Sequence, residues 1–274
     1  MKRRFSIATI IRIIFLVLIT AACIFPFYVM IIMGTYKSEE IFKGIPLLPS
    51  NYLIQNFKNV YNSGFLRFYF NSFYISILAS FFAVLFSAMA GFAFAKYKFK
   101  GKNILFNFVI VTLMIPTGLG VIGFIIEMRE FGWVNTHLPL FMPWIASSFG
   151  VFLMTQFMKD GIPSEVLDSA RIDGCSEPRI FMVFALNFVK PAALTLTLIT
   201  FLQAWNNFLV PLIIINKQSL FTVPIGVFAL GDLFRYDYGA IILALGIATI
   251  PQIIIFTIAS KSFISGLTVG AIKG

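Results

Sequence analysis

Six stretches of the chain contain no Asp, Glu, Lys, Arg or His and are long enough to cross a membrane. About 20 apolar residues in an α-helix span the hydrocarbon core of a bilayer. Backbone groups in lipid must be hydrogen-bonded internally, so each stretch is predicted to be a transmembrane helix. The pattern therefore predicts an all-α integral membrane protein with one transmembrane domain over residues 1–274. The six predicted spans are 13–36, 68–95, 103–126, 138–158, 191–216 and 238–260.

Two shorter apolar runs, 180–189 and 218–231, are too short for a straight span and are predicted to be interfacial or re-entrant. The first long run follows Lys2, Arg3 and Arg4, as a signal peptide does, but it continues past Cys23 to Tyr36. Because the apolar region of a signal peptide has only about 7–15 residues, we expect a retained transmembrane helix.

Composition and charge agree with a membrane protein. The chain is 59% hydrophobic, with a net charge of +10 and a mean hydropathy of +0.93. In a soluble protein that positive charge would suggest nucleic acid. Here, with the N-terminus inside, the inner segments hold 14 Lys and Arg and the outer segments hold 7. Positive charge is retained on the cytoplasmic side, so both termini are expected in the cytoplasm and no nucleic-acid partner is expected.

No pattern for enzyme chemistry is present in the sequence. His137 is the only histidine, and it has no nearby nucleophile motif. Cys23 and Cys175 are far apart and make no metal-ligand set with it. The phosphate-binding pattern G-x-x-x-x-G-K-[ST] does not occur either. We therefore expect a non-enzyme that itself holds no metal, cofactor or ATP.

The six runs carry uncharged polar residues and no ionisable ones other than Tyr and Cys. Proton-coupled carriers usually need an acidic or basic residue within a span, which disfavours a stand-alone secondary carrier. Two interpretations of the polar residues stay open. They either hydrogen-bond neighbouring helices, as is common in membrane bundles, or line a path for an uncharged solute such as a sugar. The candidates for the path are Asn71, Gln203, Asn206 and Asn207.

The stretch SEVLDSARIDGCSEPR, residues 164–179, is rich in charge although apolar runs lie on both sides. Ser164 is predicted to cap a short helix, and Val166, Leu167 and Ala170 share one face of it. Asp168 and Arg171 are spaced to form an ion pair. Gly174 suits a left-handed helix end, and Asp173 is expected to accept backbone donors of the next turn. A second helix with Phe181, Phe184 and Phe188 on one side is predicted to follow. The pattern favours a cytoplasmic docking site over a solvated loop.

This stretch resembles a known motif. IPSEVLDSARIDGCSEPRIF is similar to the EAA loop of ABC importer membrane subunits, in the form that carbohydrate importers use. FLQAWNNFLVPLIII (201–215) and the terminal FISGLTVGAIKG (263–274) resemble segments of the maltose-transporter MalG-type subunit. The similarity extends over nearly the whole chain, which is identified as a member of this permease family.

The resemblance implies the type I ABC importer permease fold, with six transmembrane helices and a cytoplasmic EAA coupling helix in the loop 159–190. It implies a second, MalF-type permease subunit, two copies of a cytosolic ABC ATPase that bind ATP and Mg, and an extracellular solute-binding protein that delivers sugar. It places the chain in the bacterial cell membrane. The residues that it assigns to ATPase coupling are Glu165, Leu167, Asp168, Ser169, Ala170, Asp173 and Gly174.

In MalG-type subunits the C-terminal tail enters between the ATPase subunits, which implies the same for Gly270, Lys273 and Gly274. A frayed terminus is the alternative. Two alternatives to a carbohydrate importer permease also stay open: an ABC importer for a non-sugar solute such as a polyol phosphate, and a stand-alone secondary carrier.

Overall fold

The computed structural model describes residues 7–116, 118–233 and 236–271, with the backbone alone for 232, 233 and 261–271. Within these residues all regular structure is helical. Two compact units are formed: unit 1 takes in the chain up to Leu66 together with Gly226–Ile250, and unit 2 takes in Arg67–Ile225 and the chain from Pro251 onward. Each unit is described by itself.

Unit 1 contains a long apolar helix and a small cap. Its helices are α1 (Ile7–Met33), α2 (Ser38–Ile41) and α3 (Leu53–Asn62), with most of α14 (Val223–Leu233) and the first part of α15 (Tyr238–Ala271). In the most apolar part of α1 no side chain is buried, as suits a helix that faces lipid or another subunit. The prediction of a long apolar helix at this position is confirmed.

Two polar side chains hold the cap of unit 1 together. Asn56 of α3 donates from Nδ2 to the carbonyls of Gly34 and Tyr36, each at 2.8 Å. The carboxylate of Asp237, next to the start of α15, accepts from Ser38 at 2.8 Å and from Asn59 at 2.7 Å. These bonds fasten both short helices to the ends of the long ones.

Unit 2 is built on the long helix α4. Its elements are α4 (Phe65–Lys96), α5 (Lys102–Leu113), α6 (Val121–Glu130), α7 (Leu138–Phe141), α8 (Ser148–Gly161), α9 (Ser164–Ile172), α10 (Glu177–Arg179), α11 (Leu186–Phe188), α12 (Lys190–Trp205) and α13 (Leu209–Ile214). Shorter turns are the 3-10 helices Met142–Ala146 and Gln218–Leu220 and the π-helix Ile180–Ala185. The part of α15 from Pro251 also belongs here.

Small residues let α4 and α8 approach closely. A Cβ on Gly91 of α4 would lie 2.6 Å from the Cβ of Met154 in α8. A Cβ on Gly150 of α8 would overlap Ser87 Oγ in α4. Small residues at helix contacts are the usual packing device in membranes, where close van der Waals contact replaces the hydrophobic effect.

Two buried clusters fill unit 2. One, the inner cluster, joins α4, α8 and α12 to the α9 region and includes Phe92, Met154, Met158, Leu167 and Leu196. The other, which is nearer the outer end of α4 in the predicted topology, includes Ile75, Met128, Leu140, Ile214 and Ile225. The first cluster reaches directly under α9 and so fixes its position on the unit.

Not every predicted span is a continuous helix. By length and composition, the described part of the chain holds four helices that suffice to cross a membrane: Ile7–Met33, Phe65–Lys96, Leu138–Gly161 and Tyr238–Ser260. A fifth is added if Glu177–Phe188 and Lys190–Trp205, which meet at 79°, count as one bent span. The all-helical multi-pass prediction is confirmed. Three of the six runs are not one continuous α-helix: the run 138–158 passes through α7, the 3-10 helix Met142–Ala146 and α8, and the other two are interrupted more sharply.

The run 103–126 is not one helix, which contradicts the prediction. Helix α5 ends at Leu113, and at 1.5 Å per residue its 12 residues cover only about 18 Å. Pro116 has no N–H to continue the ladder, and Gly118 and Gly120 follow it. The chain turns here, with Leu119 N–H donating to the Pro116 carbonyl at 3.1 Å, before α6 begins.

The run 191–216 is likewise interrupted, between α12 and α13. Asn206 ends α12 as its C-cap, and Pro211 lies in the short α13. The interruption therefore falls at a pair of asparagines, Asn206 and Asn207, for which the pattern predicted a place inside a single span.

Candidate coupling site and translocation path

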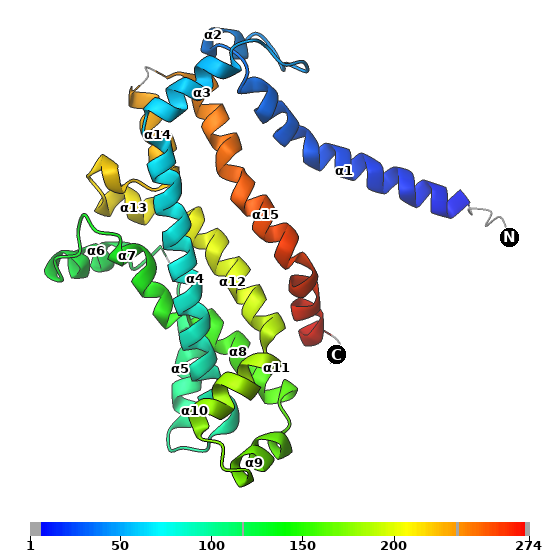
Figure 1. Ribbon diagram of the computed structural model, residues 1–274, viewed down its shortest axis with the longest axis vertical. Coiled ribbons are helices and arrows are strands. Elements are labelled where there is room, and N and C mark those ends of the chain that lie inside the picture. The colour runs from blue at the N-terminus through cyan, green and yellow to red at the C-terminus, as the bar shows by residue number, and fades with distance from the viewer. Residues whose placement is uncertain (1–6, 117, 234–235, 272–274) are drawn as a thin grey trace. The chain divides into compact units, whose positions relative to one another are not determined.

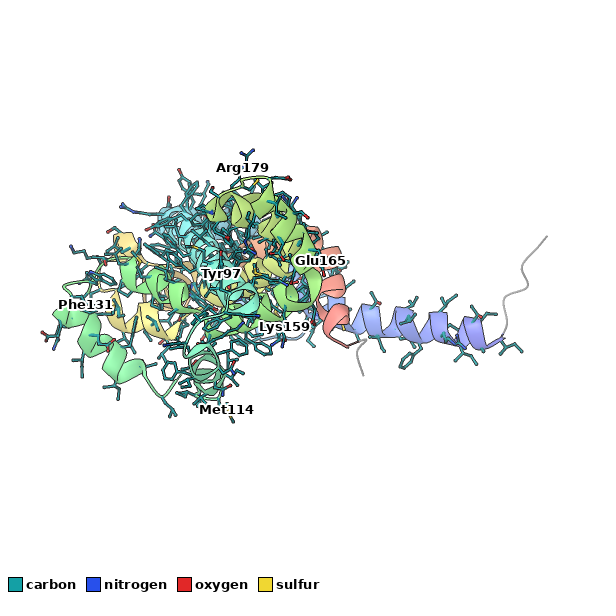
Figure 2. All side chains as sticks on the ribbon, turned by 90° about the horizontal axis from the view of Figure 1, so that it is seen from below. Tyr97, Met114, Phe131, Lys159, Glu165 and Arg179 are labelled. Atoms are coloured by element: carbon teal, nitrogen blue, oxygen red, sulfur yellow. The ribbon has the colours of Figure 1, made fainter. Side chains whose placement is uncertain are left out.

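Helix α9 is a short polar helix at one end of unit 2 (Figure 1). Figure 2 views the molecule from this end and shows the labelled Tyr97, Lys159 and Glu165 near one another in projection, with Arg179 at the margin. The prediction that Ser164 caps α9 is wrong. The N-cap is Pro163 in an extended conformation, which makes no side-chain cap bond, and Ser164 is the first helical residue.

The apolar face of α9 packs on unit 2 as predicted. Leu167 and Ala170 are 2% and 4% exposed, and Val166 is half-buried. Glu165, Asp168 and Ser169 are exposed on the opposite side, and Ser169 Oγ donates back to the Glu165 carbonyl at 2.8 Å. The helix therefore has one apolar face packed on unit 2 and one exposed polar face.

A Schellman motif ends α9. The N–H of Gly174 donates to the Arg171 carbonyl and the N–H of Cys175 donates to the Ala170 carbonyl, each at 3.0 Å. Gly174 has φ +76°, the left-handed conformation that a residue without Cβ adopts most easily. The predicted role of Gly174 as the helix stop is confirmed.

The end of α9 also exposes an apolar side chain. Ile172 is 86% exposed, which is costly for an isoleucine in water. The carboxylate of Asp173 makes no hydrogen bond or ion pair with any residue that the structure describes, so the prediction that it accepts backbone donors of the next turn is wrong. Ile172 and Asp173 together form an exposed tip of α9. The side chain of Ile172 is not buried there, and the carboxylate of Asp173 is not bonded by any residue that the structure describes.

Charged side chains brace the last turn of α9. Arg171 bonds Asp168 at 2.9 Å, as predicted, and also Glu177 at 2.8 Å. Tyr97, which follows α4, donates its hydroxyl to the same Glu177 carboxylate. The bonds from Arg171 and Tyr97 hold the pKa of Glu177 below its usual value. The two acids in turn raise the pKa of Arg171, while burial and the bond to Glu177 raise the pKa of Tyr97.

Sequence reasoning missed three residues of this site: Lys96, Tyr97 and Glu177. Lys96 Nζ donates to the Ile162 carbonyl at 2.5 Å and to the Lys159 carbonyl at 3.4 Å. Lys96 and Tyr97 lie more than 60 residues before their partners, so only the tertiary fold brings them together. The only signal for Lys96 and Tyr97 was the lysine-rich run AKYKFKGK between two apolar runs, which was interpreted as a cytoplasmic loop that resembles the corresponding segment of the family.

The chain beyond α9 continues as α10, the π-helix Ile180–Ala185 and α11. Phe181 and Phe184 pack against the inner cluster, and Phe188 is exposed. The predicted aromatic side of this segment is therefore confirmed for the first two rings only. The segment meets α12 at 79°, which agrees with an interfacial position.

The four predicted path residues separate into two groups. Asn71 is buried and donates to the carbonyls of Ser219 at 3.1 Å and Phe221 at 2.9 Å, which favours an interhelical structural role. The other three gather at the break between α12 and α13. Gln203 and Asn206 are exposed, and Asn206 Nδ2 donates to Gln252 Oε1 at 3.0 Å.

Asn207, the third of these residues, makes a hydrogen bond at the break between α12 and α13. Asn207 Oδ1 accepts from the N–H of Val210 at 3.4 Å, a local side chain-to-backbone bond next to the start of α13. Exposed amides near a helix break in a membrane unit offer donors and acceptors that the surrounding hydrocarbon side chains do not.

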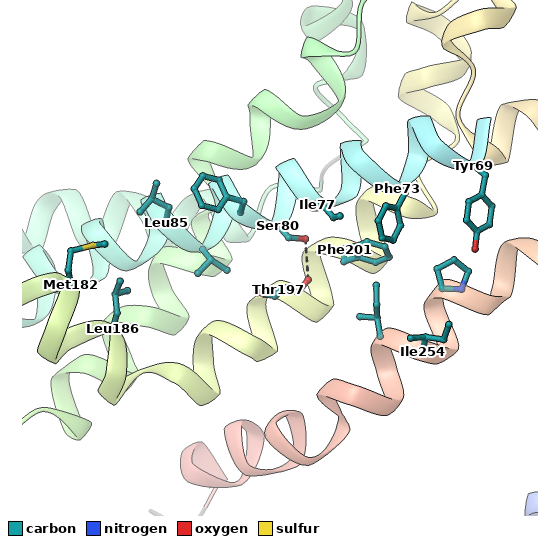
Figure 3. A pocket seen from close by; sticks show the side chains of 14 residues that line it. Tyr69, Phe73, Ile77, Ser80, Leu85, Met182, Leu186, Thr197, Phe201 and Ile254 are labelled. Atoms are coloured by element: carbon teal, nitrogen blue, oxygen red, sulfur yellow. Dashed lines mark hydrogen bonds between the residues drawn. The ribbon is translucent and has the colours of Figure 1, made fainter. Parts of the chain in front are cut away.

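A large apolar groove lies in unit 2, with a volume of about 960 Å³. It is lined by side chains of α4, the π-helix, α11, α12 and α15, among them Phe73, Leu85, Leu186, Phe201 and Ile254 (Figure 3). Its polar groups include Ser80, whose Oγ donates to the Thr197 carbonyl at 3.3 Å. The groove lacks the polar lining that a sugar site requires.

The predicted tail contact falls mostly outside the described residues. Gly270 is in the last turn of α15, where only the backbone is described, and Lys273 and Gly274 lie outside the described residues.

The apolar helices are those of a multi-pass membrane protein, and one short polar helix, α9, packs on unit 2 by its apolar face. Residues 83–268 match the family model described as "Binding-protein-dependent transport system inner membrane component". The chain therefore belongs to this family of ABC transporter permeases, and it is a non-catalytic membrane subunit, because ATP hydrolysis in these systems is done by a partner ATPase.

Curated relatives and a solved structure agree with this assignment. The chain is 31% identical over 99% of its length to the arabinooligosaccharides transport system permease protein AraQ of Bacillus subtilis, 98% of which is covered. It is 29% identical over 92% of its length to the sn-glycerol-3-phosphate transport system permease protein UgpE of Escherichia coli, 93% of which is covered. A bacterial ABC transporter involved in the import of the acidic polysaccharide alginate has a chain of the same fold, with TM-score 0.79, 17% identity, and coverage of 96% of this chain and 100% of that one.

Proposed function

We propose that the chain is one of two permease subunits of an ATP-driven carbohydrate importer and forms half of its translocation pore. The observation that carries this proposal is α9: a helix with a buried face, a polar outer face and an exposed Ile172–Asp173 tip, stopped by Gly174. A helix with this geometry would suit a groove on a cytosolic ATPase, which is the role that the family resemblance implies. The name of AraQ, an arabinooligosaccharide permease, supports a carbohydrate as the solute.

Work would be transmitted through α9. ATP draws the two ATPase subunits together, each ATPase moves the coupling helix that it holds, and the spans fixed to that helix follow. The residues that we assign to ATPase coupling are Glu165, Leu167, Asp168, Ser169, Ala170, Asp173 and Gly174. Among them Leu167 and Ala170 act from the buried face, by fixing α9 to unit 2, and the exposed ones act by direct contact.

The path for the solute would pass the α12–α13 break. Gln203 and Asn206 are exposed there, and their amides match the hydroxyl groups of a sugar. Asn71 is left out of the path because both of its amide bonds go to backbone carbonyls. The charge distribution of the loops supports an orientation with both termini in the cytoplasm, and the family of the chain supports a position in the bacterial cell membrane.

Other subunits would complete the transporter. We expect a MalF-type sister permease, two copies of the ABC ATPase, which hold ATP and Mg, and an extracellular binding protein that delivers the solute. The decisive experiment is purification of the tagged chain with its neighbours, followed by uptake in vesicles. An ATPase that co-purifies, together with uptake that requires ATP, is the expected result; ATP-independent uptake by the chain alone would instead establish a secondary carrier.

A polyol phosphate is the second candidate solute, and the name of one relative supports it. UgpE, which is similar over 92% of the chain, is named for sn-glycerol-3-phosphate. A panel of arabino- and malto-oligosaccharides against glycerol phosphates, offered to the assembled complex with its binding protein, separates the two. Asn206→Ala should reduce oligosaccharide uptake and leave ATPase co-purification intact; preserved uptake in this variant would remove Asn206 from the path.

A further inference from the structure

The cytoplasmic end of α4 holds both ends of the α9 segment. Its last residue, Lys96, contacts the chain just before α9, and the next residue, Tyr97, contacts the chain just after it. Two adjacent residues at one helix end thus grip a segment of about 15 residues at its entry and its exit.

The entry contact is made by a lysine at a helix end. Lys96 Nζ donates to the Ile162 carbonyl at 2.5 Å, and more weakly to the Lys159 carbonyl at 3.4 Å in the last turn of α8. These carbonyls belong to the end of a helix, where unpaired acceptors and the helix dipole favour a cation. Asp160 and Glu165 are also within its electrostatic reach. Lys96 therefore ties α4 to the α8–α9 joint.

The exit contact passes through a carboxylate. Tyr97 donates its hydroxyl to Glu177 Oε2, and Arg171 reaches the same carboxylate with Nε at 2.8 Å and Nη2 at 3.4 Å. Because Arg171 lies in the last turn of α9, the path Tyr97–Glu177–Arg171 links α4 to the end of α9 in two steps, each a hydrogen bond to a charged group.

Phe92 supports the Tyr97 ring from inside. This buried residue of α4 packs edge-to-face on Tyr97 with ring centroids 5.5 Å apart, and its ring centroid lies 5.7 Å from that of Phe181 beyond α10. The ring of Tyr97 is therefore backed by a residue that itself belongs to the inner cluster, and its hydroxyl is aimed at Glu177.

These contacts cross the two joints at which the helical hydrogen-bond ladder is interrupted. Before α9 the helix ladder is interrupted at Ile162–Pro163, and after α9 it is stopped by Gly174 at φ +76°. If α9 were held only through these joints, a pull on it would be absorbed by rotation at the joints. The hydrogen bonds of Lys96 and Tyr97 bypass these two joints, so they can transmit a displacement of α9 to the long helix α4.

We propose that Lys96, bonded to the Ile162 carbonyl, and Tyr97, bonded to the Glu177 carboxylate that Arg171 also contacts, form a brace that transmits displacement of α9 directly into α4. The inference rests on the proposed function, in which a cytosolic ATPase moves α9. Lys96, Tyr97 and Glu177 are positioning residues, since they act through α9 and touch neither solute nor nucleotide.

The test uses the assembled complex in vesicles and measures solute transported per ATP hydrolysed. Lys96→Met, Tyr97→Phe and Glu177→Gln should each lower this ratio, by roughly tenfold if one hydrogen bond to a charged group is lost, while the ATPase still co-purifies. Lys96→Arg should restore much of the ratio because it keeps the cation. The matched control is Lys100→Met, which removes a lysine of the same loop that is exposed.

A double-mutant comparison distinguishes a shared path of transmission from independent effects of the two substitutions. Because Tyr97 and Glu177 act in one path, the double variant Tyr97→Phe with Glu177→Gln should be no worse than the poorer single variant. Additive losses would overturn the shared path, and loss of ATPase co-purification would show that these residues serve docking instead of the brace.

The proposed function and the brace fail in different ways. If Gly174→Val uncouples the complex while Lys96→Met and Tyr97→Phe keep the wild-type ratio, the brace is wrong and the role of α9 stands. If all three variants keep the wild-type ratio, α9 is not the coupling element and the brace falls with it.

Discussion

Gly150 of α8 faces Ser87 of α4 so closely that a Cβ on Gly150 would overlap the Ser87 Oγ and lie 2.9 Å from the Ser87 Cβ. The third neighbour, Leu196 Cδ2, would lie at 2.9 Å. The contact joins the two helices that carry the brace and the entry to α9. Ser87 Oγ has no hydrogen-bond partner among the described residues, so its hydroxyl can be removed without loss of a bond to any of them.

Replacement of Gly150 should therefore separate α4 from α8. Gly150→Ala is expected to destabilise the protein by about 1–3 kcal/mol, the usual cost of overpacking. Ser87→Gly in the same chain should recover part of the lost stability, since it removes the Oγ and Cβ of Ser87 and leaves only Leu196 Cδ2 close. The measurement is the thermal unfolding midpoint in detergent. Gly161→Ala at the end of the same helix has open space around its Cβ and should change little; equal midpoints for both alanine variants would contradict the close contact.

Gly174→Val should uncouple ATP hydrolysis from transport. The position has φ +76° and open space around it, so the cost arises from backbone conformation and is about 1–2 kcal/mol. The matched variant is Gly174→Asn, because asparagine adopts the left-handed conformation more readily. In vesicles, Gly174→Asn should keep uptake and ATPase activity close to wild type. Gly174→Val should hydrolyse ATP without a matching uptake of solute. If the Gly174→Val variant still couples ATP hydrolysis to transport, residues 164–176 are an ordinary loop and their coupling role is wrong.

His137 should make stability fall as the pH falls. Nε2 lies 2.7 Å from the Leu220 carbonyl, which can only accept, so this nitrogen carries the proton, and Nδ1 takes the hydroxyl of Tyr74. Burial, and more weakly the positive charge of Arg67, hold the His137 pKa below its ordinary value. The unfolded chain therefore binds the proton more tightly, and stability is lost as the pH falls below about 6.5.

The corresponding measurement is the unfolding midpoint between pH 7.5 and pH 5, that is, about one unit above to about 1.5 units below the ordinary histidine pKa. The decline should be smaller in His137→Gln, which keeps a donor for Leu220 but does not titrate. Tyr74→Phe leaves the titrating ring in place and should keep the decline. The same slope in His137→Gln as in the wild type would assign the pH effect to other groups.

Reporter fusions should establish the orientation of the chain. A phosphatase or fluorescent reporter after Lys100 or at Gly274 is expected to give the cytoplasmic signal, and one near Asn51 the external signal. The reason is the excess of Lys and Arg in the segments assigned to the inside. Reversed signals at these positions would refute the assignment of both termini to the cytoplasm.

Deletion of residues 270–274 should lower the ATPase activity that depends on solute and leave membrane insertion intact. The expectation rests on the resemblance of the terminal segment to MalG-type subunits, whose tail enters between the ATPase subunits. Replacement of 270–274 by the same number of Gly and Ser residues serves as a length control. Unchanged stimulation in the deleted chain would identify the tail as a frayed terminus.

Charge-free runs located the helices well but did not reveal where they break. Asn206 and Asn207 look like any polar pair within an apolar run, and Pro116 resembles Pro26, which α1 accommodates without ending. Whether a proline or an amide ends a helix depends on whether neighbouring groups satisfy the freed backbone positions. That is a property of the tertiary packing, which a single run does not contain.

The α9 site was predictable as far as its chemistry is local. Leu167, Ala170, Gly174 and the Asp168–Arg171 pair follow from helix spacing and from the conformational freedom of glycine. Tyr97 and Lys96 were not predictable, because their partners are 80 and 66 residues away in the chain. Asp173 was assigned to a local cap, but the Schellman bonds of Gly174 and Cys175 satisfy that helix end without it.

The π-helix Ile180–Ala185 makes the segment after α9 tolerant of a change in length. A π-helical turn contains one more residue than the α-helical turn that it replaces. Ile180 and Ala185 at its ends are buried, whereas Val183 between them is exposed. Loss of Val183 would convert the turn to an α-helix and leave the phase of the flanking helices nearly unchanged. Natural or designed relatives of this chain that are one residue shorter here can therefore keep the same 79° approach to α12.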